Sequence, residues 1–420
     1  MQDETQASEQ GDAAPKSMSG FHATMFVFLT VCIDSIGFGI IIPVLPDLIR
    51  EVTNLGYSGA ALWGGWMSFS YAVMQFVFGP TVGNLSDRFG RRPILLASLA
   101  VMAVDYIIMA LAPSLLVLFV GRIIAGIAAA TYSTCNAYVA DVSKPEDRAK
   151  NFGLLGAAFG LGIVIGPVIG GLIAEYGTRA PFYAAAGLAL LNLCYGAFVL
   201  PESLPKEKRR PFDWLRANPL GAFGRMRKVP TVAWFLVALF LFDIAHFTYP
   251  SVWAYYSKEA FKWSSAEVGL SLAVVGIGFV IVQAWLIRIL LPTIGEVRTA
   301  YAGFFFNVIS LALIGFITEG WMVYAILPLT ALSALLTPAL QGLMSNRIAD
   351  DAQGELQGAM TSVTAITLAV SPLLMTQLFG HFTGPNAPIY LPGAPFLAAS
   401  VITAIAIIPF TIGLRQSRRS

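Results

Sequence analysis

Residues 83–93 read G-N-L-S-D-R-F-G-R-R-P and connect two apolar runs, 61–82 and 94–112. Each run is long enough to cross a bilayer as a helix. Glycine allows the backbone conformations that a tight reversal needs, and proline suits the first turn of the following helix. The stretch therefore predicts a short cytoplasmic turn between two transmembrane helices, with a plain basic anchor loop as the alternative. Its candidate functional residues are Gly83, Asp87, Arg88, Gly90, Arg91 and Arg92.

The composition is that of an integral membrane protein. Of 420 residues, 56% are hydrophobic and 12% are charged, and the mean hydropathy is +0.71. Soluble domains carry about 25% charged residues. The alternating segments of about ten residues that a β-barrel needs are absent from the sequence. We therefore expect an all-α membrane protein, and the net charge of +2 gives no indication of a nucleic-acid partner.

The cysteines and the first residues carry no special chemistry. Cys32, Cys135 and Cys194 lie inside apolar runs, and this odd, dispersed set fits neither a disulfide framework nor a metal site. Residues 1–20 lack the basic start and apolar core of a signal peptide. We expect a disordered cytoplasmic tail there, and no metal or cofactor anywhere in the chain.

Apolar segments predict twelve transmembrane helices. They lie at about 22–48, 61–83, 94–112, 115–139, 151–174, 181–200, 230–256, 266–291, 298–317, 321–343, 356–380 and 393–414. The loops after even-numbered segments hold most of the lysine and arginine, which predicts that both termini are cytoplasmic.

The chain is expected to consist of two related halves of six helices. Segment 201–229 is a basic linker between 21–200 and 230–414, followed by a short tail at 415–420. A shift of 205 positions lays Gly90 on Gly295 and Pro167 on Pro372. Duplicated halves in such transporters enclose a substrate site near the middle of the membrane.

The fifth segment contains a strip of glycines at helical spacing. Because they recur every four residues, they predict one smooth face against which another helix packs closely. Pro167 permits a bend within the same helix. Plain close packing is the alternative to a functional role. The residues of this motif are Gly162, Gly166, Pro167, Gly170 and Gly171.

Charged residues inside a bilayer are costly and usually functional. Asp34 is a candidate to carry a proton, or else to form a fixed ion pair with Arg122, the available cation. Asp243 and His246 lie on one helical face and are a candidate coupled pair, with a structural hydrogen-bonded pair as the alternative. Asp105 faces either a cavity or a neighbouring helix.

Polar and aromatic residues within the segments are candidate substrate contacts, although each polar residue is as well explained by bonds between helices. These candidates are Gln75, Asn136, Gln283, Asn307, Gln341, Tyr249 and Trp253. The aromatic residues form either a stacking wall for a planar ligand or an interfacial belt. The sequence has no phosphate-binding loop of the G-x-x-x-x-G-K-[ST] type and no catalytic constellation, so we expect no enzyme activity.

Several of these stretches resemble one family over residues 25–414. The loop at 83–93 resembles a signature of the major facilitator superfamily, and the fifth segment resembles its drug-antiporter motif. Further segments resemble the bacterial tetracycline/proton antiporters within it. These are I-D-S-I-G-F-G-I-I-I-P-V-L-P at 33–46, Y-A-V-M-Q at 71–75, V-D-Y at 104–106, G-R-I-I-A-G at 121–126, N-A-Y-V-A-D at 136–141, G-P-V-I-G-G at 166–171, L-P-E-S at 200–203 and P-A-L-Q at 338–341.

The resemblance implies roles for three acids and also has two departures. Asp34, Asp105 and Asp87 correspond to family acids that handle protons and substrate or that gate the cytoplasmic side. The family carries a further acid in the ninth segment, where this chain has Asn307. Conversely, Asp243 and its neighbouring histidine stand where the family is uncharged. We therefore expect the second titratable group to have moved from the ninth segment to the seventh.

Together these features predict a proton-coupled antiporter of a bacterial inner membrane. It is expected to act as a monomer among membrane lipids and to export a small amphiphilic molecule, with tetracycline as the best single substrate. A proton-coupled importer of a sugar or other metabolite, or a membrane receptor without transport, are the alternatives.

Overall fold

The computed structural model describes residues 20–129, 131–144, 147–213, 230–348 and 353–417, and the elements within these ranges are helices. The predicted tail and most of the predicted linker lie outside the described residues. The first half comprises α1 (Gly20–Ile41), α2 (Leu45–Thr53), α3 (Tyr57–Phe89), α4 (Arg91–Leu111), α5 (Leu115–Ala128), α6 (Thr131–Val142), α7 (Arg148–Ile173) and α8 (Ala180–Val199). The second half comprises α10 (Pro230–His246), α11 (Thr248–Ala260), α12 (Ser265–Ile281), α13 (Ile287–Phe316), α14 (Gly320–Leu332), α15 (Leu336–Ser345), α16 (Gln353–Thr383) and α17 (Ala394–Ser417). Short turns η2 (Ala174–Tyr176), η3 (Lys206–Lys208), η4 (Val282–Leu286) and η5 (Ser333–Leu335) extend or join them.

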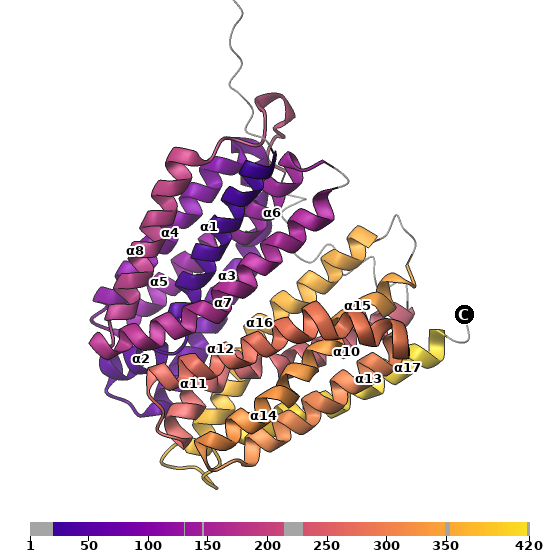
Figure 1. Ribbon diagram of the computed structural model, residues 1–420. Coiled ribbons are helices and arrows are strands. Elements are labelled where there is room, and N and C mark those ends of the chain that lie inside the picture. The colour runs from indigo at the N-terminus through magenta and orange to yellow at the C-terminus, as the bar shows by residue number, and fades with distance from the viewer. Residues whose placement is uncertain (1–19, 130, 145–146, 214–229, 349–352, 418–420) are drawn as a thin grey trace, which may run out of the picture.

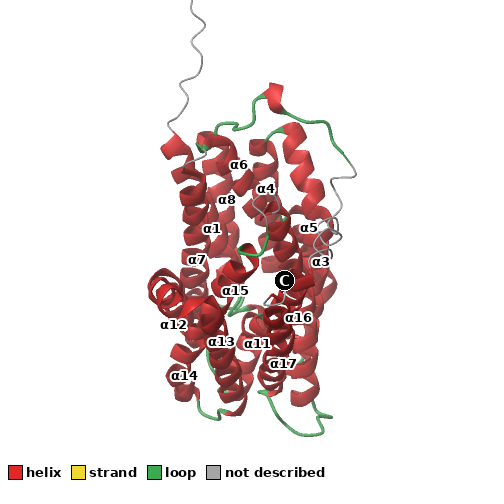
Figure 2. Cartoon of the chain, turned by 90° about the vertical axis from the view of Figure 1, so that its right-hand side faces the viewer, coloured by secondary structure: helices red, strands yellow, loops and turns green. Residues whose placement is uncertain are grey.

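The two halves form two helical bundles that lean against each other (Figure 1). They meet mainly along two helix pairs, α3 with α16 and α7 with α12, and α11 also packs against α3. Figure 2 shows the same helices from the side, with the loops gathered at the two ends of the bundles. The predicted fold class, an all-α membrane protein built from two halves, is confirmed.

Several predicted spans are broken helices. The first span is interrupted around Pro43: α1 ends at Ile41, and α2, which has Pro46 in its first turn, is bent from α1 by 47°. The loop predicted at 292–297 is much shorter in the structure. There α13 passes through Gly295, whose φ of 79° and ψ of 164° are the only non-helical values inside the helix. Glycine reaches this backbone region without steric cost, so one residue is enough for the kink.

By length and hydropathy, nine helical stretches among the described residues qualify as membrane spans, or ten if the bent α1–α2 pair counts as one. The difference from the twelve expected has two causes. The eighth and ninth expected spans lie in one continuous stretch, Ser265–Phe316, because helical hydrogen bonding continues past Gly295. In addition, α3 is too polar along its length to qualify, and it lies between α5 of its own half and α16 of the other.

The contacts between the halves are concentrated at one end of the molecule, which we call the α2 end. A Cβ added at Gly65 of α3 would lie 3.1 Å from the Cβ of Thr376. At the opposite end, which carries Asp87, an added Cβ at Gly83 of α3 or Gly153 of α7 would meet no described atom within 4 Å. The two halves are therefore packed together at the α2 end, and Figure 1 shows the two bundles diverging from there toward the opposite end.

Candidate functional site

The turn between α3 and α4 is held by a network of charges. Gly90 has a φ of 106°, which lets the chain reverse between the two helices. The Arg91 guanidinium bonds to Asp87 at 2.6 Å and to Asp141 of α6 at 3.0 Å. Glu202, at the end of the first half, accepts hydrogen bonds from the backbone N–H groups of Arg91 (2.8 Å) and Arg92 (3.3 Å). These groups lie at the start of α4, where a helix favours a carboxylate. Arg88 instead lies over the Phe89 ring, 5.2 Å from its centroid.

The second half contains a counterpart of this turn. Gly295 and Gly90 share a positive φ and a ψ near 160°, at positions related by the shift found in the sequence. The next residue, Glu296, accepts a hydrogen bond from Asn346 at 2.9 Å. By the same shift this pair corresponds to Arg91 and Asp141. The two turns therefore share their geometry although the residues that bond differ.

Inside the first half, the structure distinguishes two acids. Asp105 of α4 forms an ion pair with Arg122 of α5, and its side chain is 1% exposed. The same guanidinium lies over the ring of Tyr71, 5.5 Å from its centroid. Asp34 of α1 is half-buried, and no hydrogen bond or ion pair reaches it from the described residues. Arg122 is therefore the partner of Asp105 rather than of Asp34.

Asp243 and His246 lie on one turn of α10 but contact different groups. The Asp243 carboxylate accepts a hydrogen bond from the Thr364 hydroxyl of α16 at 3.0 Å. The His246 ring stacks on Phe242 with centroids 5.5 Å apart and lies 5.8 Å from the ring of Phe279 on α12. The pair thus reaches two neighbouring helices, α16 and α12, and these two helices make the most extensive contacts of the second half with the first.

The glycine strip of α7 packs closely against another helix, as its spacing predicts, and in the structure that helix is α1. An added Cβ at Gly166 would lie 2.7 Å from the Cα of Gly39 and from the Ile36 carbonyl oxygen. The other side of α7 meets the second half, where Gly171 lies against the backbone of Ser265. Gly162 and Gly170 likewise lie against the α1 backbone, and Pro167 lies between Gly39 of α1 and Gly269 of α12. Both close approaches need glycine because backbone atoms occupy the place of a side chain.

The remaining polar candidates lie in different surroundings. Asn307 of α13 is 3% exposed and donates to Thr403 of α17 at 2.9 Å, so it joins two helices of one half. Gln75 donates to the Ala129 carbonyl at 3.3 Å, and Asn136 to the Tyr132 carbonyl at 3.0 Å. Gln283 is exposed within η4, a π-helical turn, and Gln341 is half-buried on α15.

The aromatic candidates are part of a packed cluster on α11. Tyr249 and Trp253 stack with ring centroids 4.5 Å apart. Trp253 is fully buried and donates its indole N–H to Ser271 of α12 at 2.9 Å. Phe396 of α17 lies edge-on to both rings. In this conformation the cluster therefore fills the core of the second half at the α2 end.

The sequence reasoning missed an ion pair between Asp47 of α2 and the buried Lys258 of α11, 2.6 Å apart. Lys258 lies just beyond the span expected at 230–256 and was therefore counted as a loop residue, whereas α11 continues to Ala260 in the structure. The Thr364 hydroxyl was also missed, because threonine is common in such helices and has no motif around it.

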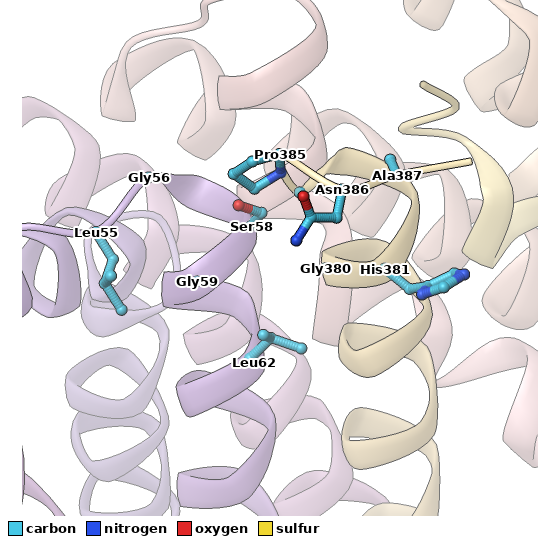
Figure 3. A pocket seen from close by; sticks show the side chains of 11 residues that line it. Leu55, Gly56, Ser58, Gly59, Leu62, Gly380, His381, Pro385, Asn386 and Ala387 are labelled. Carbon is cyan, nitrogen blue, oxygen red and sulfur yellow. The ribbon is translucent and has the colours of Figure 1, made fainter. Parts of the chain in front are cut away.

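A shallow pocket of about 340 Å³ opens at the α2 end between the two halves (Figure 3). Its walls come from the start of α3 and from the end of α16 with the loop that follows, and none of the acids above lines it. Within the described part of the chain, no group of three or more histidine, cysteine, aspartate or glutamate side chains is placed to hold a metal ion.

Comparison with known proteins gives a consistent result. A model of the Major Facilitator Superfamily matches residues 27–372. The chain is 40% identical to the class C tetracycline resistance protein of Escherichia coli, over 86% of this chain and 91% of the relative. It is 36% identical to the class G tetracycline resistance protein of Vibrio anguillarum, over 92% and 99% of the two chains.

Among solved structures, the fold is similar to that of a bacterial homologue of the human lysosomal transporter Spinster. The TM-score is 0.77 at 15% identity, over 96% of this chain and 98% of the other. At this identity the likeness describes the fold, and it agrees with the arrangement of two helical halves described above.

Proposed function

The chain belongs to the Major Facilitator Superfamily, and we propose that it is a proton-coupled antiporter that exports tetracycline or a similar amphiphilic molecule across a bacterial inner membrane. The observation that carries the proposal is the 40% identity to a tetracycline resistance protein over most of both chains. The arrangement of acids within the two halves supports it.

In this proposal Asp34 is the principal proton carrier of the first half. Its carboxylate is half-buried and free of partners among the described residues, so it can exchange a proton or meet a substrate cation. Asp105 is held by Arg122, and this pair maintains the structure around the carrier. Substrate and proton then compete for one carboxylate, which is the simplest form of antiport.

Asp243 is the proposed carrier of the second half. Its hydrogen bond to Thr364 connects the acid to α16, which also packs against α3 of the first half. A change in its protonation therefore acts on a helix that joins the two halves. Asn307 cannot take this role, because an amide does not ionise and its side chain is used between α13 and α17.

We place the Asp87 end, which is rich in arginine, in the cytoplasm, together with both termini. Because the halves are separated at this end, the conformation described is proposed to face the cytoplasm, where a drug would enter. The Asp87–Arg91–Asp141 network lies on one half and is proposed to guide closure of this side. Lipid contacts of the basic linker and a monomeric state belong to the same proposal.

The test is tetracycline uptake into everted membrane vesicles that contain the protein. An imposed proton gradient, acidic inside, is expected to drive accumulation, and an uncoupler is expected to abolish it. Asp87→Asn is expected to slow uptake while tetracycline binding is kept. Accumulation that ignores the gradient, or that requires a gradient of the opposite sign, would refute proton antiport.

A further inference from the structure

The α2 end holds a buried polar cluster that joins the two halves. One oxygen of the Asp47 carboxylate accepts a hydrogen bond from the Tyr57 hydroxyl at 2.9 Å. The other oxygen accepts from the Lys258 ammonium at 2.6 Å and from the Ser265 hydroxyl at 3.1 Å. Lys258 also donates to Ser265 at 2.7 Å. Every polar group of the cluster thus has a partner, as a buried ion pair requires.

Three helix termini bring these residues together. Asp47 lies in the first turn of α2, where the helix dipole favours an anion, and Lys258 lies in the last turn of α11, where it favours a cation. Ser265 begins α12 directly after the turn that follows α11. Asp47 belongs to the first half, whereas Lys258 and Ser265 belong to the second, so the cluster exists only while the halves meet here.

A second ion pair at the same end is more exposed to solvent and is therefore expected to contribute less to stability. Arg179 and Glu51 are 2.8 Å apart, but both belong to the first half and their side chains are 30% and 42% exposed. Exposed pairs of this kind contribute little to stability. In the Asp47–Lys258 pair, the lysine side chain is 2% exposed and the aspartate side chain is 26% exposed, so the burial lies on the lysine. Removing the Asp47 charge would leave the buried Lys258 ammonium without compensation, which is strongly unfavourable.

We propose that Asp47, Lys258 and Ser265 form a lock that keeps the α2 end closed and that opens once in each transport cycle. The lock rests on the proposed function, since only a transporter must expose its site at both ends in turn. The adjoining packing is of the same kind: the Ser265 backbone lies against Gly171 of α7, and Gly269 lies against the Pro167 carbonyl. Opening the α2 end must separate these surfaces together with the ion pair.

The test measures how often the α2 end opens. Cys32, Cys135 and Cys194 are replaced by serine, and Thr376, which is 1% exposed between α16 and α3, is replaced by cysteine. Intact cells are treated with a membrane-impermeant maleimide from outside. We expect Asp47→Asn and Lys258→Met each to speed labelling tenfold or more, which corresponds to about 1.4 kcal/mol of weakened closure.

Two control variants make the result specific. Glu51→Gln removes a charge from the exposed pair at the same end and is expected to label at the rate of the parent protein. Lys258→Arg keeps the positive charge and its donors and is expected to stay slow. Labelling of both Asp47→Asn and Lys258→Met at the Glu51→Gln rate would overturn the lock. If Lys258→Met fails to reach the membrane, Asp47→Asn decides the question, because it is almost the same size as the parent side chain.

The labelling experiment uses neither drug nor proton gradient, so it separates the lock from the proposed substrate. Fast labelling of the two variants supports the lock even if vesicles take up no tetracycline. Normal labelling together with active uptake would remove the lock and leave the antiport proposal in place.

Discussion

At the scale of single residues, Asp34 and Asp105 of the first half have the same side-chain chemistry but different surroundings. Asp105 is paired with Arg122 and buried, so its charge is part of the structure. Asp34 has no such partner among the described residues and is half-buried. Because of this difference, Asp34 is the proposed carrier of the exchangeable proton.

Replacing the proposed carriers tests that assignment. We expect Asp34→Asn and Asp243→Asn each to lower gradient-driven tetracycline uptake at least tenfold, because asparagine cannot release a proton. Counterflow of tetracycline, which needs no net proton movement, is expected to survive in Asp243→Asn. Thr364→Val is the matched control: it removes the hydrogen bond but keeps the carboxylate, and it is expected to change the pH profile rather than abolish uptake.

Two outcomes would contradict the proposed role of Asp243 as a proton carrier. Unchanged accumulation in Asp243→Asn would remove α10 from the proton path and leave Asp34 of the first half as the carrier. Loss of counterflow as well as accumulation would place Asp243 in substrate binding instead.

Residue-scale reasoning from the sequence identified the charged candidates but not their pairing. Spacing along one helix is enough to place Asp243 and His246 on one face. It cannot show that Asp243 meets Thr364 of a distant helix, because many polar residues lie on the other helices. For the same reason Arg122 was available to either of two acids until the positions of α1, α4 and α5 were known.

At the scale of elements, α7 is a helix that packs closely against two others, α1 and α12. One side of it, marked by Gly166, lies against α1 of its own half, and another side, marked by Gly171, lies against α12 of the other half. The sequence predicted the first contact, because the period of the glycines specifies a face. It did not predict which helix fills that face, and the kink at Gly295 was likewise read as a longer loop.

A larger side chain on that face tests its role. We expect Gly166→Leu to abolish uptake, because its added atoms would overlap the backbone at Gly39 and Ile36, and overpacking of this kind costs about 1–3 kcal/mol. Gly156→Leu lies on the same helix where an added Cβ meets no described atom, and it is expected to remain active. Uptake and melting temperature are measured for both variants, so that loss of transport is distinguished from loss of folding. A folded Gly166→Leu protein with normal uptake would mean that the close approach of α1 is not needed for transport.

At the scale of the whole molecule, two similar halves meet at the α2 end and separate at the Asp87 end. The sequence predicted the two halves from the shift of 205 positions and the repeated turn at Gly90 and Gly295. It did not predict which end is closed. That depends on contacts such as Asp47 with Lys258, which lie 211 positions apart and belong to different halves.

The most direct test of the account is the direction in which protons move with the drug. The purified protein is reconstituted into liposomes that contain a pH-sensitive dye, with the membrane potential clamped, and tetracycline is added outside. Antiport predicts that the interior becomes more alkaline as drug enters and protons leave, and that Asp34→Asn and protein-free liposomes lack this signal. An interior that becomes more acidic would mean that proton and drug move together, and it would contradict the account.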